Sequence, residues 1–105
     1  MKKNQQQVAS ELELDKDRGI VVRNGRPVRL TQLEISLLEI FMQQPNRIFS
    51  KIELLQKAEA SGLALGRKSL AVHIHNLRKK IDHDFENTLL KTVIGVGYLL
   101  KMKTG

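Results

Sequence analysis

The segment that most constrains the fold of this chain is residues 31–44, which read as a helix that is apolar on nearly every side. Thr31 and Glu34, in TQLE, have the spacing of a capping box at a helix N-terminus, and Pro45 ends the helix. A narrow polar strip is formed by Ser36, Glu39 and Gln43. A helix with this much apolar surface has to be enclosed by other elements, so we expect it in the middle of the domain.

The sequence before this helix predicts a small antiparallel sheet. Residues 1–10 are polar and rich in glutamine, and we expect a linker or disordered terminus there, with one domain over residues 11–105. ELELD, GIVVR and RPVRL are short alternating segments, separated by the turns DKDRG and Asn24-Gly25. Pro27 lacks an N–H group, which indicates that the third strand lies at an open edge.

The segment after the central helix predicts a second, shorter helix. SKIE, at Ser50–Glu53, has the capping-box spacing again, and Ile52, Leu55 and Ala58 are expected to face the core. The following ASGLALGR contains two glycines and predicts a loop over about residues 60–67.

Residues 67–82 predict a basic amphipathic helix. At about 100° per residue, its apolar stripe is formed by Leu70, Ile74, Leu77 and Ile81. The opposite side carries Lys68, Val72, His75, Asn76 and Lys79. A valine that points away from the core has no folding reason to be there, so Val72 needs a partner outside the domain.

The C-terminal segment LLKTVIGVGYLLK predicts a β-hairpin of two apolar strands around a Gly-Val-Gly turn. The order of elements is therefore sheet, helix, short helix, loop, basic helix and hairpin. This order predicts an α+β winged helix-turn-helix fold, with an N-terminal antiparallel sheet, three helices and a C-terminal β-hairpin wing at about residues 91–101.

The positive charge of the chain is concentrated in its C-terminal part. Of the formal net charge of +7, residues 1–66 carry +2 (ten Lys/Arg, eight Asp/Glu) and residues 67–105 carry +5 (eight Lys/Arg, three Asp/Glu). This distribution points to a polyanionic partner, with nucleic acid first and an anionic membrane surface second, while a merely basic surface is the plain alternative. Single-stranded RNA fits less well, because the chain has few aromatic residues for base stacking.

Length and composition disfavour several other classes of protein. A chain of 105 residues suits one domain, and without cysteine it has no disulfide or thiolate metal site. The start MKKNQQQ continues as a polar segment, and no apolar run is long enough to cross a bilayer. We therefore expect a soluble, cytoplasmic protein without membrane contact.

Metal, cofactor and catalytic sites are not indicated. His73 and His75 are two positions apart and point in nearly opposite directions on a helix, so they cannot share a metal ion. Gly95-Val96-Gly97 lacks the third glycine and the following helix of a dinucleotide-binding motif. No catalytic motif occurs, so we expect neither an enzyme nor a cofactor.

Double-stranded DNA accounts best for the exposed side of the basic helix. In the major groove, Asn76 can bond an adenine edge, and His75 and Lys68 can donate to guanine. Val72 would contact a thymine methyl group, which gives it the missing partner. Phosphates on either side would be reached by Arg78, Lys79 and Lys80.

Four segments resemble, in order and spacing, the DNA-binding effector domain of OmpR/PhoB-type response regulators: LTQLEISLLEIF, NRIFSKIELL, SLAVHIHNLRKKI and LLKTVIGVGYLL. The resemblance covers residues 11–101, and VHIxxLRKK followed by TVxGVGY is its most specific part. It implies sequence-specific binding of double-stranded DNA and control of transcription. The helix at about 67–82 would lie in the major groove, with the wing at about 91–101 on the DNA backbone.

The resemblance also implies individual contacts. Base contacts would come from Ser69, Ala71, Val72, His75 and Asn76. Phosphate contacts would come from Lys68, His73, Arg78, Thr92 and Tyr98, and the helix projection adds Lys79. Two positions depart from the family pattern. Ile94 stands where an arginine commonly enters the minor groove, which puts that contact in question, and Glu59 stands where a tryptophan is common.

The partners implied by the resemblance act through a longer protein. In the family, a receiver domain precedes this one, accepts phosphate from a sensor histidine kinase and drives dimerisation; residues 1–10 resemble the end of the linker to it. The domain alone is then expected to be a monomer that pairs on direct repeats in a promoter. The family's loop at residues 60–67 contacts RNA polymerase, although here its sequence is apolar rather than acidic.

A function of another class is the alternative: a winged-helix module that binds an acidic protein partner through the same basic face. Little affinity for any duplex at low salt would favour it, because DNA binding through a basic surface is strongest there.

Overall fold

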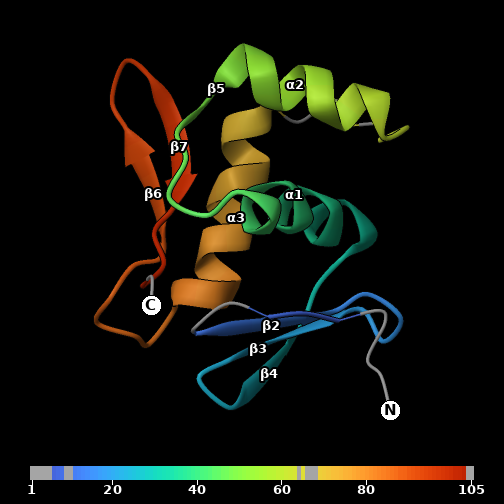
Figure 1. Ribbon diagram of the computed structural model, residues 1–105, viewed down its shortest axis with the longest axis vertical. Coiled ribbons are helices and arrows are strands. Elements are labelled where there is room, and N and C mark those ends of the chain that lie inside the picture. Colours follow the sequence, from blue (N-terminus) through green and yellow to red (C-terminus); the bar gives the residue numbers. More distant parts are fainter. Residues whose placement is uncertain (1–5, 9–10, 64, 66–68, 104–105) are drawn as a thin grey trace.

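The computed structural model describes residues 6–8, 11–63, 65 and 69–103 of the chain. In this part of the chain, a sheet near the N-terminus lies next to the first helix and the C-terminal end of the third, the second helix lies at the opposite end of the molecule, and a hairpin near the C-terminus runs beside the third helix (Figure 1). The helices and the hairpin share one core with the inner face of the sheet. This arrangement confirms the predicted α+β winged helix-turn-helix class.

The N-terminal sheet contains β1 (Gln6–Val8), β2 (Leu12–Asp15), β3 (Ile20–Arg23) and β4 (Arg26–Arg29), which pair antiparallel in this order. The turn between β3 and β4 has positive φ angles at Asn24 and Gly25, 48° and 86°, as expected for a two-residue hairpin. β4 is an edge strand, which confirms the interpretation of Pro27. The expected linker over residues 1–10 is interrupted by β1, because strand pairing uses backbone groups that a polar segment also supplies.

Helix α1 (Gln32–Gln43) is the enclosed helix that the sequence predicts. The Thr31 hydroxyl accepts a hydrogen bond from the Glu34 backbone N–H at 3.2 Å, and the Glu34 carboxylate accepts one from the Thr31 N–H at 2.9 Å. The capping box is therefore complete. Phe41, at the C-terminal end of the helix, is fully buried and meets Phe49 edge to face, with ring centroids 5.5 Å apart.

Helix α2 (Lys51–Ala60) begins as predicted but faces the core with a different side. Ser50 caps it by accepting a hydrogen bond from the Glu53 N–H at 3.0 Å, while the Glu53 carboxylate pairs with Arg47. Ala58 is buried as expected, but its buried partner is Leu54. The inward placement of Ile52 and Leu55 was wrong: both are exposed, because the pairing of the residues before the helix rotates the other apolar stripe inward.

Helix α3 (Leu70–Asp82) carries the predicted apolar stripe, and Leu70, Ile74, Leu77 and Ile81 are all buried. It begins three residues later than the predicted start at 67. The reason is that the Ser69 hydroxyl accepts a hydrogen bond from the Val72 N–H at 3.3 Å and makes Ser69 the N-cap.

The predicted hairpin consists of β6 (Leu90–Val93) and β7 (Gly97–Leu100), and a two-residue strand before α2, β5 (Phe49–Ser50), adds to it in the order β5-β7-β6. Strand β5 was not predicted from the sequence. Gly97 makes this pairing possible, since a Cβ atom there would overlap the backbone carbonyl of Phe49. The first turn of α2 is thereby attached to the hairpin.

Candidate nucleic-acid interface

The outer side of α3 presents the predicted mixture of one apolar and several polar side chains. Ala71, Val72 and His75 are exposed, and Val72 keeps 40% of its surface accessible. Asn76, one turn after Val72, is partly buried at the edge of this side. Ser69 is exposed as well, and its hydroxyl can still donate a hydrogen bond while it caps the helix.

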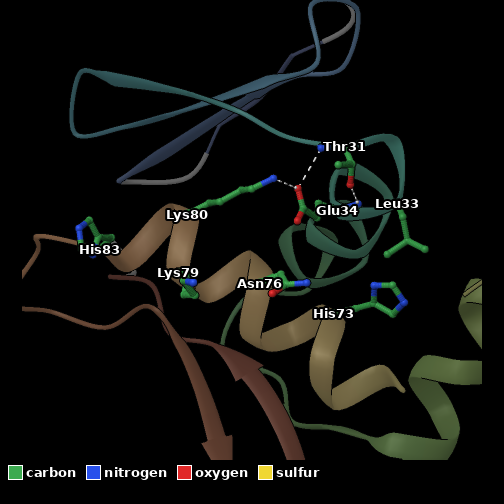
Figure 2. Close-up of a pocket in the computed structure, with 8 residues that line it drawn as sticks. All are labelled: Thr31, Leu33, Glu34, His73, Asn76, Lys79, Lys80 and His83. Carbon is green, nitrogen blue, oxygen red and sulfur yellow. Dashed lines mark hydrogen bonds and ion pairs between the residues drawn. The ribbon is translucent and has the colours of Figure 1, made fainter. Parts of the chain in front are cut away.

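A cleft of about 540 Å³ runs beside this side of α3, toward the start of α1 (Figure 2). The α3 side contributes polar groups, and the α1 side contributes the capping box. The cleft is lined by Thr31, Leu33, Glu34, His73, Asn76, Lys79, Lys80 and His83. The basic and amide groups of the cleft lie next to the exposed side of α3, so a DNA interface can extend from that side of α3 into the cleft.

Within the cleft, Lys80 is bound to α1. Its ammonium group donates to the Glu34 carboxylate at 2.7 Å. Burial raises the pKa of Glu34. The hydrogen bonds from Lys80 and Thr31, together with the Lys80 charge, lower the pKa by more than burial raises it, so the pKa lies below its ordinary value. The helix projection placed Arg78, Lys79 and Lys80 on phosphates. Of these, Lys80 has an acidic partner inside the domain, and Lys79 is exposed on the surface of α3.

His73, expected on a phosphate, is partly buried, and its Nε2 lies 2.8 Å from the carbonyl oxygen of Leu65. Because a carbonyl only accepts, the ring nitrogen donates, and the histidine holds Leu65 against α3. Lys68, expected on bases and phosphates, lies outside the described residues, as do Ala64, Gly66 and Arg67 of the loop compared with a polymerase-binding loop.

The structure brings Arg78 and Thr92 together. The Arg78 guanidinium donates from Nε to the carbonyl of Leu90 at 2.8 Å and from Nη2 to the Thr92 hydroxyl at 2.7 Å. Thr92 lies opposite Tyr98 in the β6–β7 register. Three of the residues expected on phosphates, from α3 and both hairpin strands, therefore share one surface.

Lys51, which was not among the residues predicted from the sequence, joins this surface. A cleft of about 290 Å³ next to the hairpin is lined by Lys51, Thr92, Val93, Gly95, Val96, Gly97 and Tyr98. Lys51 is the first residue of α2, and the β5–β7 pairing is what brings it to the hairpin. No local pattern around Lys51 contains this information.

The tip of the hairpin is apolar. Ile94 is 91% exposed and Val96 is 55% exposed, in the turn where the family commonly has an arginine. Lys91, on β6, is exposed and offers a positive charge lower on the hairpin. The tip can therefore contact sugars or other apolar groups, whereas a cationic contact has to come from neighbouring residues such as Lys51 or Lys91.

Within the described ranges, no group of three or more His, Cys, Asp or Glu side chains is placed to hold a metal ion. Over the same ranges, none of the helices has the length and apolar character needed to span a membrane.

Comparisons with known proteins place these features in a family. Residues 25–100 match the family described as "Transcriptional regulatory protein, C terminal". The chain is 35% identical over 92 residues to the response regulator MprA of Mycolicibacterium vanbaalenii, and the match covers 88% of this chain and 40% of that protein. The chain thus spans about 40% of the length of curated relatives such as this one.

Solved structures agree with the family match. The C-terminal domain of the nisin resistance regulator NsrR, a lantibiotic response regulator, has a TM-score of 0.77 at 30% identity, over 90% of this chain and 94% of that one. The DNA-binding domain of the response regulator AdeR, solved in complex with an intercistronic region, has a TM-score of 0.71 at 28% identity, over 92% and 99%.

Proposed function

The chain belongs to the family of C-terminal DNA-binding domains of OmpR/PhoB-type transcriptional regulatory proteins, and on this premise we propose that it binds double-stranded DNA at specific sequences. Helix α3 lies in the major groove, and the β6–β7 hairpin lies on the backbone beside it. Bases are contacted by Ser69, Ala71, Val72, His75 and Asn76.

The observation that carries the proposal is the exposure of Val72 among hydrogen-bonding side chains. Burying its exposed surface against a thymine methyl group is favourable, and no apolar contact of this kind is available from a phosphate. His75 and Asn76 flank it and have the donors and acceptors that base edges require. A helix side built only for phosphates would need neither the valine nor the amide.

Phosphate contacts position the domain on the duplex. They come from Lys68, His73, Arg78, Lys79, Thr92 and Tyr98, and we add Lys51. Arg78, Thr92 and Tyr98 lie together on the hairpin side, and Lys51 faces the same cleft, so one DNA strand can pass along them.

The longer protein supplies the regulation in this proposal. A receiver domain accepts phosphate from a sensor histidine kinase in the cytoplasm and brings two copies together. Two DNA-binding domains then occupy direct repeats in a promoter, while the domain alone is a monomer that pairs on DNA. The loop at residues 60–67 is a candidate contact for RNA polymerase.

In vitro selection from a randomised duplex library, at near-physiological salt, tests the proposal. We expect enrichment of a short motif, repeated about one helical turn, or roughly 10 base pairs, apart. Retention of DNA without enrichment would contradict base reading by α3 and leave only the phosphate contacts. If no duplex is retained even at low salt, the domain is instead a protein-interaction module whose basic face binds an acidic partner.

A further inference from the structure

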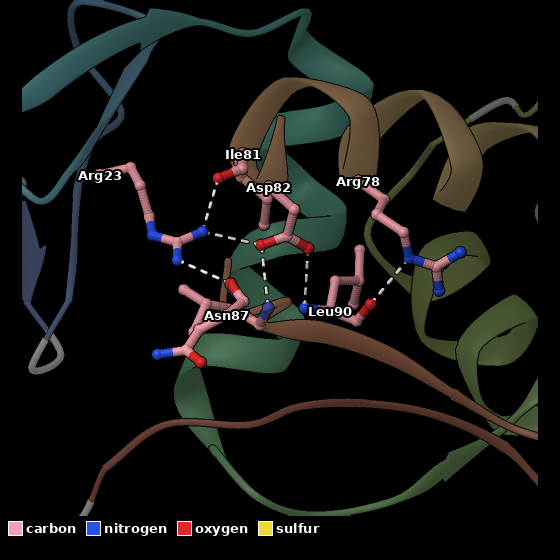
Figure 3. Close-up of polar contacts among 7 residues, drawn as sticks. Arg23, Arg78, Ile81, Asp82, Asn87 and Leu90 are labelled. Carbon is pink, nitrogen blue, oxygen red and sulfur yellow. Dashed lines mark hydrogen bonds and ion pairs between the residues drawn. The ribbon is translucent and has the colours of Figure 1, made fainter. Parts of the chain in front are cut away.

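A buried ion pair joins the N-terminal sheet to the C-terminal end of α3 (Figure 3). Arg23, the last residue of β3, has 1% of its surface exposed. Its Nη1 donates to the Asp82 carboxylate at 2.8 Å and to the carbonyl of Ile81 at 2.7 Å, and its Nη2 donates to the carbonyl of Asn87 at 2.9 Å. Arg23 therefore binds both the helix end and the segment that leads to the hairpin.

The Asp82 carboxylate also holds the beginning of the hairpin. It accepts hydrogen bonds from the backbone N–H groups of Leu89 at 2.9 Å and Leu90 at 3.1 Å. One buried carboxylate thus connects the sheet, the recognition helix α3 and strand β6. We call Arg23, Asp82 and Leu90 the joint.

Leu90 is bound to α3 through both of its backbone groups. Its N–H donates to Asp82, and its carbonyl accepts from Arg78, one helical turn earlier on the same helix. A shift of β6 along α3 by one residue would break both hydrogen bonds. The position of the hairpin relative to α3 is therefore fixed by two contacts that require a single register.

The chemistry of the joint favours a positioning role over a purely stabilising one. A buried ion pair loses hydration, and an apolar pair of similar volume often stabilises a fold equally well. An apolar pair has no directional bonds, however, whereas this pair satisfies four backbone groups from two segments. What the ion pair adds is a defined geometry between α3 and β6.

We infer that Asp82 is a positioning residue for DNA recognition, which holds the hairpin where its phosphate contacts and the base contacts of α3 reach one duplex together. The inference rests on the proposed function. Contacts from two elements support each other only when their spacing matches the DNA before binding, because otherwise ordering them costs binding free energy. Arg23 extends the same constraint to the N-terminal sheet.

The test compares how much the hairpin contributes to the affinity for DNA when the joint is intact and when it is broken. Tyr98→Phe removes the hydroxyl of one proposed phosphate contact of the hairpin, and we expect it to weaken binding of the selected duplex by about tenfold in the wild-type domain. In the Asp82→Asn background, which keeps the side-chain shape, the same change should weaken binding by less than about twofold. Fluorescence anisotropy, well below the unfolding temperature, measures all four affinities.

Two further variants separate positioning from stability. Ile35→Ala removes buried side-chain volume from α1 without touching the joint, so it lowers stability but should leave the tenfold effect of Tyr98→Phe unchanged. Arg23→Lys replaces the forked guanidinium by a single ammonium, and it takes the place of Asp82→Asn if that variant does not fold. An undiminished Tyr98→Phe effect in the Asp82 or Arg23 variant would overturn the inference.

Hydrogen exchange in the absence of DNA tests the contacts of the joint independently of the proposed DNA-binding function. In Asp82→Asn, one carboxylate oxygen is replaced by an NH2 group, and the oxygen that remains stays with Arg23, which donates to Oδ1. The Leu90 amide hydrogen, which donates to Oδ2, then loses its acceptor and should exchange at least about tenfold faster than in Ile35→Ala of matched stability. Equal exchange would overturn the joint itself. A wild-type domain that binds no duplex would overturn the proposed function, and the role in DNA recognition with it, even where the exchange result upholds the joint.

Discussion

At the scale of single residues, Gly97 is the position where the fold leaves no room for a side chain. A Cβ atom there would overlap the Phe49 carbonyl and lie 2.9 Å from the Ser50 Cα. Because both obstacles are backbone atoms of a paired strand, we expect Gly97→Ala to lower the free energy of unfolding by about 1–3 kcal/mol in urea denaturation. Val96→Ala, in the exposed turn, should change it by less than about 0.5 kcal/mol. Equal losses in the two variants would contradict the steric explanation.

Asn76 and Lys79 allow base reading and phosphate binding to be separated at neighbouring positions of α3. Asn76→Ala should reduce discrimination at one base position by about 1–3 kcal/mol and leave the affinity for random duplex nearly unchanged. Lys79→Ala should weaken binding to all sequences alike. Competition binding with a panel of single-base variants of the selected site measures both. If both substitutions weaken every sequence equally, the division of this helix side into bases and phosphates is wrong.

At the scale of elements, Glu34 links the first turn of α1 to the last turns of α3. Its pKa is lower in the folded domain, so its contribution to stability is present above the unfolded pKa, about 4.3, and is lost as the pH falls through the folded value. We expect Glu34→Gln to be less stable than the wild type near neutral pH by about 1–3 kcal/mol, because the Lys80 ammonium group and the Thr31 N–H then face a neutral amide in place of the buried carboxylate.

The same prediction requires the difference in stability between Glu34→Gln and the wild type to shrink as the pH falls below the unfolded pKa and through the lower folded pKa, where the wild-type carboxylate becomes neutral. Urea denaturation at several pH values measures this difference. Glu39→Gln is the control on the same helix, since its ion pair with Lys16 is partly solvent-exposed and should contribute less than about 1 kcal/mol. A difference for Glu34→Gln that is constant with pH would contradict the link.

Elements with a local signal could be predicted from the sequence, and contacts that depend on distant segments could not. The capping box of Thr31 and the positive φ angles of Asn24-Gly25 follow from neighbouring residues, and both were confirmed. On α2, two apolar stripes are available, and the choice of Leu54 over Ile52 is made by the β5–β7 pairing. Strand β5 is two residues long, which is too short for any alternating pattern to indicate.

The same distinction, between local signals and contacts with distant segments, applies to the residues of the candidate interface and of the joint. The outward position of Val72 follows from the helical period and was confirmed, because one periodic stripe determines both sides of a helix. Arg23 and Asp82 are 59 residues apart in the sequence, and each looks like an ordinary charged residue at the end of its element. Lys51 likewise reaches the hairpin only through tertiary pairing. The roles of these residues depend on their contacts in the folded domain, and the sequence of a single chain does not show which distant residues they contact.

At the scale of the whole molecule, the total of 18 Lys and Arg residues overstates the number of cations that can face DNA. Several positive side chains already have acidic partners within the domain: Lys16, Arg18, Arg23, Arg26, Arg47 and Lys80. The proposed phosphate cations are Lys51, Lys68, Arg78 and Lys79. Since each neutralised phosphate contributes about −0.9 to the slope of log K against log salt, we expect a slope between about −3 and −4 for one domain on a single half-site.

Binding measured from low to physiological salt gives this slope, and single substitutions show which cations produce it. Lys51→Ala should make the slope shallower by about one unit if α2 faces the backbone, whereas Lys80→Ala should leave it nearly unchanged because Lys80 is paired with Glu34. A wild-type slope near −7 would mean that charges outside the α3 and hairpin surface also contact DNA. If Lys51→Ala has no effect on the slope, the DNA strand passes along α3 and the hairpin without reaching α2, and the interface is narrower than the clefts indicate.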